Sequence, residues 1–230
     1  MDTPGLIIVE APMGEGKTEA ALAMAEIIAK KNGHTGLFFA LPTQATSDGI
    51  FPRVVKWLEK VSLNEGSSKT IFLSHSRSEF NKTYAEIPLS SNCSSEDRLI
   101  IHEWFYGKKK RILSDIVVGT IDQILMAGLK RKHLPMRHLG LCNKVVVIDE
   151  VHAYDAYMGN YLEKCLMWLS SFNVPVILLS ATLPIARRKK LVDAYMNGRG
   201  LNAKGETWET DIRYPLITFT QHDFVKSLNP

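Results

Sequence analysis

Cysteine is scarce in this sequence, and its few positions do not suit a covalent framework. The three cysteines, Cys93, Cys142 and Cys165, are odd in number and widely spaced along the chain. Disulfide-rich domains and zinc ribbons need paired cysteines at regular spacings. The pattern therefore argues against both classes and favours a protein of the reducing cytoplasm.

Long hydrophobic runs and a signal-like beginning are also missing. No apolar stretch reaches the roughly 18 residues that a membrane-spanning helix requires. The first residues do not place a basic region before an apolar segment, which is the pattern of a secretory signal. The sequence contains no internal repeat. We therefore expect a cytoplasmic protein that makes no membrane contact.

Apolar residues are plentiful enough to form a sizeable core. Of the 230 residues, 45% are hydrophobic and 23% are charged, which is typical of a folded globular chain. This length accommodates one large domain or two small ones. Disorder is therefore excluded as the main state of the chain.

Positive charge is concentrated in one region, although the net charge of +4 is modest. Between residues 108 and 138 only Asp115 and Asp122 oppose eight basic residues. These are Lys108, Lys109, Lys110, Arg111, Lys130, Arg131, Lys132 and Arg137. Such a local excess suits a polyanion. A solvated loop surface is an equally good interpretation from charge alone.

Apolar segments alternate with helical patterns along the chain, which predicts a parallel sheet covered by helices on both faces. Strands are predicted at 6–10, 37–41, 70–73, 116–118, 145–148 and 176–179. Helices are predicted at 17–31, from 43 or 47 onward, and at 96–106, 121–129, 157–169 and 184–197. The serine-rich segment 74–95 is predicted to leave the core. The expected fold class is therefore α/β.

The strongest motif follows the first predicted strand and opens the first predicted helix. Its residues 11–18 read Ala-Pro-Met-Gly-Glu-Gly-Lys-Thr, which is a P-loop whose first glycine is replaced by Ala11. Glycines let several N–H groups point at one phosphate, and the helix N-terminus adds positive charge. The alternative is a plain surface turn. The predicted nucleotide-binding residues are Met13, Gly14, Glu15, Gly16, Lys17, Thr18 and Glu19.

Two acids follow the fifth predicted strand. Asp149 can hold Mg²⁺ beside the hydroxyl of Thr18, while Glu150 can orient a water molecule and take its proton. Solvated acids in a turn are the alternative, but the P-loop favours catalytic roles for Lys17, Asp149 and Glu150. Because ligands bind at the carboxyl ends of parallel strands, all these groups should share one rim of the sheet.

Together with Ser180-Ala181-Thr182, these motifs resemble the first RecA-like domain of superfamily 2 helicases, a class of P-loop NTPase. Three longer runs, 16–22, 118–123 and 149–155, resemble the helicase module of the CRISPR-associated helicase–nuclease family of type I systems. The resemblance covers residues 6–197. It implies an ATP-dependent motor with ATP and Mg²⁺ as cofactors.

The resemblance also implies roles for residues outside the nucleotide site. His152, Ser180 and Thr182 would couple the nucleotide state to the nucleic-acid path. The phosphate backbone of single-stranded DNA would be contacted by Pro42, Thr43, Gln44 and Thr120. The implied partners are a second RecA-like domain, a nuclease domain and the CRISPR surveillance complex.

We expect residues 1–197 to form the RecA-like domain and 198–230 to lead toward a second one. Motifs of that second domain do not follow Thr182, and the dipeptide His222-Asp223 is too isolated to indicate nuclease chemistry. Two other interpretations stay open: another superfamily 2 motor, such as an RNA helicase or restriction-type translocase, and a nucleotide-switched nucleic-acid-binding module. Stimulation of turnover by DNA or RNA would separate them.

Overall fold

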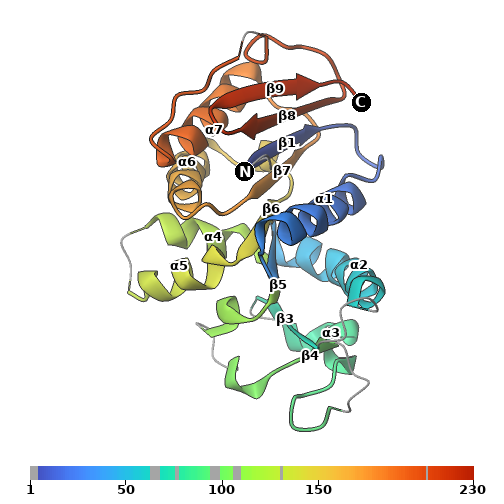
Figure 1. Cartoon of the computed structure of the whole chain (residues 1–230). Coiled ribbons are helices and arrows are strands. Elements are labelled where there is room, and N and C mark those ends of the chain that lie inside the picture. The colour runs from blue at the N-terminus through green and yellow to red at the C-terminus, as the bar shows by residue number, and fades with distance from the viewer. Residues whose placement is uncertain are drawn as a thin grey trace.

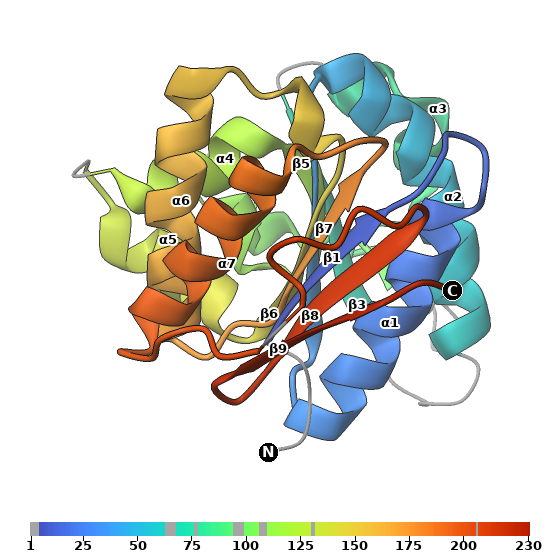
Figure 2. The ribbon, with the colours of Figure 1, turned by 90° about the horizontal axis from the view of Figure 1, so that it is seen from above.

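One mixed β-sheet forms the middle layer of the protein, and helices cover both of its faces (Figure 1, Figure 2). The computed structural model describes residues 5–62, 68–75, 78–93, 99–105, 110–129, 132–205 and 207–230. The strands are β1 (Leu6–Glu10), β2 (Gly36–Leu41), β3 (Lys69–Ser74), β4 (Leu99–Ile100), β5 (Ile116–Thr120), β6 (Lys144–Ile148), β7 (Val176–Ser180), β8 (Leu216–Gln221) and β9 (Phe224–Leu228). The α-helices are α1 (Lys17–Asn32), α2 (Gln44–Ser62), α3 (Lys82–Glu86), α4 (Ile121–Leu125), α5 (Leu134–Cys142), α6 (Ala156–Ser171) and α7 (Ile185–Gly198).

The order of the strands brings distant motifs together. Across the described residues the order is β4-β3-β5-β2-β6-β7-β1-β8-β9. All pairs from β4 to β1 are parallel, whereas β8 is antiparallel to β1 and β9 is antiparallel to β8. The first and last predicted strands, β1 and β7, are therefore neighbours. The predicted α/β architecture with a largely parallel sheet is confirmed.

Both faces of the sheet are buried, which explains why its strands are almost uninterrupted apolar runs. In β1, Leu6 and Ile8 pack toward α4, α6 and α7, whereas Ile7 and Val9 pack toward α1 and α2. Figure 2 shows these two helical layers on opposite sides of the sheet. The core is therefore double, and the sheet lies between its halves.

Most predicted elements are confirmed, with their ends shifted by a few residues. Helix α1 is capped at its C-terminus by Gly33, whose φ of 72° is the left-handed conformation that suits glycine. Helix α2 begins directly after Thr43, whose hydroxyl accepts the N–H of Thr46 at 3.1 Å. The predicted helix 121–129 is α4 followed by a 3₁₀ turn at Met126–Gly128.

The helix predicted at 96–106 is wrong. Its described part contains the short strand β4 and a 3₁₀ turn at Glu103–Phe105, while residues 94–98 lie outside the described residues. Leu99 and Ile101 are buried, as alternate residues of an extended segment. Trp104, which a helix with this spacing would bury, is 56% exposed and lies under the ammonium group of Lys110. The pairing of β4 with β3 outweighs the helical spacing.

The segment 74–95 does not leave the core entirely. Within its described part, Asn81 caps the short helix α3 by accepting the N–H of Tyr84. Tyr84 is buried, and its ring packs against Phe51 and Phe72. One aromatic residue therefore anchors a polar loop to the sheet.

Two further parts of the fold were not predicted. Helix α5 follows the basic residues Lys130, Arg131 and Lys132 in the sequence, and its first turn contains Pro135. Strands β8 and β9 lie in residues 198–230, the expected connection, and extend the same sheet beyond β1. The structural unit thus continues past residue 197. That this segment leads toward a second domain stays a prediction.

Candidate functional site

The predicted polar motifs follow the carboxyl ends of neighbouring parallel strands. Glu10, which precedes the P-loop, is paired with Ser180. Leu41, which precedes Pro42, is paired with Thr120. Asp149 follows β6, and its N–H donates to Ala40 in β2 at 2.9 Å. The motifs therefore share one rim of the sheet.

The P-loop is shaped to receive an anion. Gly14 and Gly16 have φ values of 87° and 77°, whereas Ala11 does not have a positive φ, so alanine is tolerated at the first position. A Cβ at either glycine would find no described atom within 4 Å. The ammonium group of Lys17 donates to the carbonyls of Ala11 and Pro12, both at 2.7 Å. These carbonyls hold the cation at the loop.

The other predicted nucleotide contacts differ in their surroundings. Met13 is 70% exposed, and Glu15 is also exposed, whereas Thr18 is half-buried. Glu19 is bound by the guanidinium group of Arg53 in α2, with Nε at 3.1 Å. This hydrogen bond lowers the pKa of Glu19. Glu19 therefore ties α1 to α2, and its nucleotide contact stays a prediction.

Asp149 is buried at the end of β6, with 8% of its surface exposed. Burial raises the pKa of its carboxyl group, while the N–H of Glu150, which donates to Oδ1 at 2.9 Å, and the charge of Lys17 act in the opposite direction. Tyr154 donates its hydroxyl to the carbonyl of Asp149 at 2.8 Å. A nearby cation would favour the ionised carboxylate.

Glu150 has a left-handed backbone, with φ of 54°, which is uncommon for a residue with a side chain. Its Oε2 lies 3.1 Å from Nε2 of His152. On the other side of the imidazole ring, Nδ1 accepts the N–H of Ala181 at 3.3 Å. Because Nδ1 is an acceptor, Nε2 carries the proton and donates to Glu150. His152 thus connects the acid pair to the segment after β7.

Ser180 and Thr182 complete this connection. The hydroxyl of Ser180 donates to the carbonyl of Thr182 at 2.8 Å and lies 3.3 Å from Nδ1 of His152. The N–H of Ala11 donates to the carbonyl of Ser180 at 3.2 Å. The side chain of Thr182 is exposed. Hydrogen bonds therefore link the P-loop, the acid pair and Ser180, and the coupling role of these residues stays a prediction.

Three residues at the site escaped the sequence analysis: Arg53, Tyr154 and Tyr214. The Tyr214 hydroxyl donates to the carbonyl of Ala181 at 2.8 Å, across 33 positions in sequence. Each acts through a backbone or side-chain partner that only the fold reveals. For Tyr154 alone the sequence offered a local indication, because this aromatic residue stands two positions after the D-E-x-H motif.

The four predicted DNA contacts lie on the β2–β5 side of the rim. Thr43 and Gln44 are exposed, whereas Pro42 is half-buried and Thr120 is 9% exposed. A hollow of about 470 Å³ opens here and is lined by Gln44 and Thr120 together with residues of α4 and α6. The structure therefore brings Gln44 and Thr120 to one concave surface, whereas Pro42 and Thr43 are not among its described lining residues.

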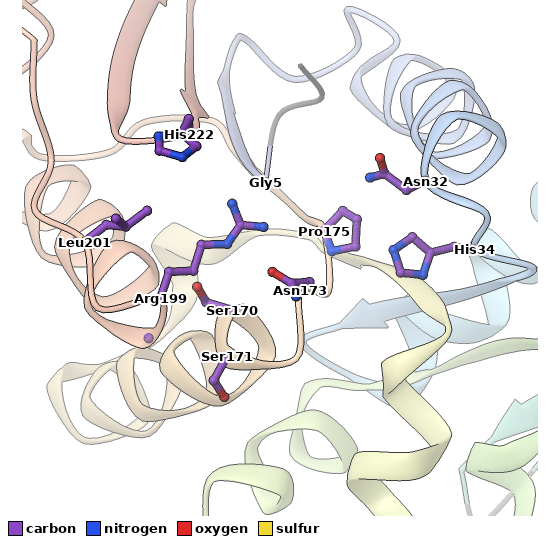
Figure 3. Close-up of a pocket in the computed structure, with 11 residues that line it drawn as sticks. Gly5, Asn32, His34, Ser170, Ser171, Asn173, Pro175, Arg199, Leu201 and His222 are labelled. Carbon is purple, nitrogen blue, oxygen red and sulfur yellow. The ribbon is translucent and has the colours of Figure 1, made fainter. Parts of the chain in front are cut away.

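A second hollow, of about 580 Å³, lies at the opposite ends of the strands (Figure 3). Gly5 and Pro175, which directly precede β1 and β7, line it, as do Arg199 and His222. None of the predicted site residues is among its lining residues. It is therefore separate from the motif-bearing rim.

Only part of the basic region can be placed. Lys108, Lys109, Lys130 and Arg131 lie outside the described residues. Lys110 lies 4.5 Å from the centre of the Trp104 ring, and Arg111 donates to the hydroxyl of Ser78 at 3.4 Å. Arg137 donates to the carbonyl of Gln123. A polyanion-binding role stays a prediction.

Neither a preformed metal cluster nor a membrane span is found in the described part of the chain. No group of three or more His, Cys, Asp or Glu side chains there could hold a metal ion. Magnesium at a phosphate site needs only one or two protein ligands, since phosphates and water supply the rest. No described helix is both long and apolar enough to cross a bilayer.

Comparison with known proteins gives consistent matches. A family model described as DEAD/DEAH box helicase matches residues 4–191. The CRISPR-associated nuclease/helicase Cas3 of Streptococcus thermophilus is 48% identical over 223 residues, covering 94% of this chain and 24% of that protein. The crystal structure of T. fusca Cas3-ATP has a TM-score of 0.80 and 39% identity, covering 99% of this chain and 24% of that one.

A further similar chain belongs to a structure described as a CRISPR RNA-guided surveillance complex, pre-nicking. It has a TM-score of 0.69 and 35% identity, covering 98% of this chain and 22% of that one. The chain thus spans about a quarter of the length of the relatives it matches.

Proposed function

Because this chain belongs to the DEAD/DEAH box helicase family, we propose that it is the first motor domain of an ATP-dependent DNA helicase of CRISPR interference. The observation that carries the proposal is the hydrogen-bonded rim that joins Lys17, Glu150 and Ser180 to one another through short links. Its similarity to Cas3 nuclease/helicases supports the CRISPR assignment.

ATP is the proposed nucleotide. The open cradle at Gly14 and Gly16 suits phosphate oxygens, and a T. fusca relative is described as Cas3-ATP. Lys17 now donates to two loop carbonyls, and it would exchange these for the β- and γ-phosphates. This exchange stabilises bound nucleotide because an ammonium–phosphate bond is stronger than one to a neutral carbonyl.

Magnesium fits the donor set beside the cradle. Thr18 offers a hydroxyl and Asp149 a carboxylate, both oxygen ligands of the kind that Mg²⁺ prefers. Burial raises the pKa of Asp149, and the charge of Glu150 acts in the same direction, so a bound cation would favour its ionised form. When bound, the metal would neutralise charge on the phosphates.

Glu150 is the proposed general base. The N–H at Nε2 of His152 holds one carboxylate oxygen, which leaves the other to accept a proton from water. Because His152 also accepts the N–H of Ala181, a change in the Glu150 contact would be transmitted to the segment after β7. That is the proposed coupling path.

Single-stranded DNA is the proposed track. Pro42, Thr43, Gln44 and Thr120 would contact its phosphate backbone, which suits a motor because such contacts do not depend on sequence. The relative in a surveillance complex supports recruitment by such an assembly. A second RecA-like domain and a nuclease domain are the other proposed partners.

Titration with a fluorescent ATP analogue tests the nucleotide site. Lys17→Ala removes the cation that faces the phosphates, so affinity should fall by about tenfold or more, as expected for a charge-assisted bond. Lys31→Ala, an exposed lysine in the last turn of α1, is the matched control and should bind normally. Equal affinity in all three proteins would remove the basis of the proposal.

A further inference from the structure

The hollow beside Thr120 has the composition of a small-molecule pocket rather than of a phosphate site. Leu125, Met126 and Met158 supply apolar walls, and Thr120 and Gln123 supply polar groups. Its volume of about 470 Å³ lies within the range of about 300–1,000 Å³ that is usual for ligand pockets. Its opening therefore suits a flat group with polar edges.

An exposed aromatic pair forms one side of this hollow. Tyr157 and Tyr161 occupy successive turns of α6, with ring centres 4.7 Å apart and hydroxyl groups 2.8 Å apart. Tyr157 is 68% exposed, although a ring of this kind usually gains stability by burial. Tyr161 packs against the core and supports its neighbour. The pair is an aromatic surface at the proposed DNA path, and Tyr157 is its exposed member.

The charge of the lining residues distinguishes two possible occupants of the hollow, a nucleobase and the phosphate backbone. No lysine or arginine is among the described residues that line the hollow, whereas Asp122 is. A carboxylate repels a phosphate but accepts hydrogen bonds from the N–H groups of a nucleobase. The lining thus favours the base over the backbone of the same strand.

The position of the hollow places it beside the proposed path of the DNA strand. Gln44 and Thr120, two of the four residues proposed to contact the DNA backbone, lie on its wall. A backbone held at these residues would place a base within reach of α6. Aromatic stacking of this kind is tolerant of sequence, as a motor requires.

We infer that this hollow binds one nucleobase of the single strand, stacked on the ring of Tyr157. The inference rests on the proposed function, because the strand must first bind at the rim. The pocket would give the domain a contact that distinguishes a strand with bases from a bare sugar–phosphate chain.

Binding to two oligonucleotides of equal length, one with bases and one fully abasic, tests the inference by fluorescence anisotropy. Tyr157→Ala should weaken binding of the base-containing strand by about fivefold or more, the range for a lost stacking contact. Affinity for the abasic strand should change by less than about twofold, because phosphate contacts remain. Tyr157→Phe keeps the ring and should restore the difference.

Trp168→Ala is the matched control, since Trp168 is another exposed aromatic residue of α6 and does not line the hollow. It should behave like the unaltered chain. Photocrosslinking with 5-iodouracil DNA gives a second measurement, in which the crosslinked peptide should contain residues 157–161.

The ways in which the inference can fail are distinguishable. If the chain binds both oligonucleotides but Tyr157→Ala weakens them equally or not at all, the base pocket is wrong and the DNA-binding function stands. A crosslink confined to other peptides would also rule out the base pocket alone. If the unaltered chain binds neither oligonucleotide, the proposed function fails and the pocket fails with it.

Discussion

Strain at a single residue points to the chemistry of the rim. Glu150 adopts φ of 54°, a conformation that costs about 1 kcal/mol or more for a residue with a Cβ. In that conformation its carboxylate meets His152, two residues further along. The sequence placed both residues in one motif, but the left-handed turn that joins them required the structure.

Glu150→Gln tests the role of this carboxylate. The amide keeps the shape of the side chain but cannot take a proton, so nucleotide should bind normally while hydrolysis falls by about 10²–10⁴-fold. Phosphate release should be measured in a polypeptide that contains both motor domains. Asp149→Asn is the comparison, and it should instead raise the Mg²⁺ concentration needed for activity. Normal turnover of Glu150→Gln would assign the base to another residue.

The lowered pKa of Lys144 predicts how the free energy of unfolding depends on pH. Its side chain is 4% exposed, donates to the carbonyls of Ile112 and Gly140, and has a pKa lowered by burial from 10.5 to about 8. Between these two values the unfolded chain binds the proton more tightly, so this group makes stability rise with pH through that window. Below this pH window the free-energy cost of burying the charged ammonium group is fully present.

Urea unfolding of the unaltered chain and of Lys144→Met measures this effect. From about pH 7.5 to about pH 10 the unaltered chain should gain about 1–3 kcal/mol relative to the variant. The other titrating groups are shared and cancel in the difference, except for groups coupled to Lys144, of which the thiol of Cys142 titrates in the same range; a Cys142→Ala background removes its contribution. Parallel stability curves would show that Lys144 titrates at its ordinary pKa.

At the scale of elements, close approach between helices depends on glycine. A Cβ on Gly198, at the end of α7, would lie 2.8 Å from the Cα of Met167 in α6 and closer still to its carbonyl oxygen. Backbone atoms cannot move aside cheaply. Gly198→Ala should therefore separate the two helices and destabilise the fold by about 1–3 kcal/mol, the range for overpacking.

Gly49→Ala is the matched control for this prediction. Gly49 lies inside α2, and a Cβ there would have no described atom within 4 Å. This substitution should stabilise the fold by about 0.5–1 kcal/mol, because alanine loses less backbone entropy in a helix. Thermal or urea unfolding measures both variants. Equal effects of the two substitutions would show that helix propensity, and not contact with α6, decides.

Elements with strong patterns and clear ends were the predictable ones. Strands β1 and β6 are apolar on both faces and end at polar motifs, so both the strands and the rim could be predicted. Strand β4 has two residues and is held by its neighbour β3, which no local pattern reports. The tyrosine contacts at Asp149 and Ala181 escaped for the same reason, since they depend on tertiary packing.

At the scale of the molecule, residues beyond 197 are built into the domain. Arg188 in α7 is buried, pairs with Glu10 at 3.0 Å and donates twice to the carbonyl of Asp211. Strand β8 covers the free edge of β1, directly before the P-loop. Both contacts end at β1, the strand that precedes the proposed nucleotide site.

The last prediction concerns the turnover of this chain by itself. In two-domain motors a second wall supplies an arginine that contributes about 10³–10⁵ in rate, as measured in other phosphoryl-transfer enzymes. Lys17, Thr18, Asp149 and Glu150 are proposed to form the side of the cleft opposite to that arginine. The chain should therefore bind nucleotide, hydrolyse it very slowly and fail to separate DNA strands.

Joining it to a second RecA-like domain should restore DNA-stimulated phosphate release, with RNA as the comparison. Rapid DNA-stimulated hydrolysis and strand separation by this chain alone, both lost in Lys17→Ala, would show that its own residues complete the site.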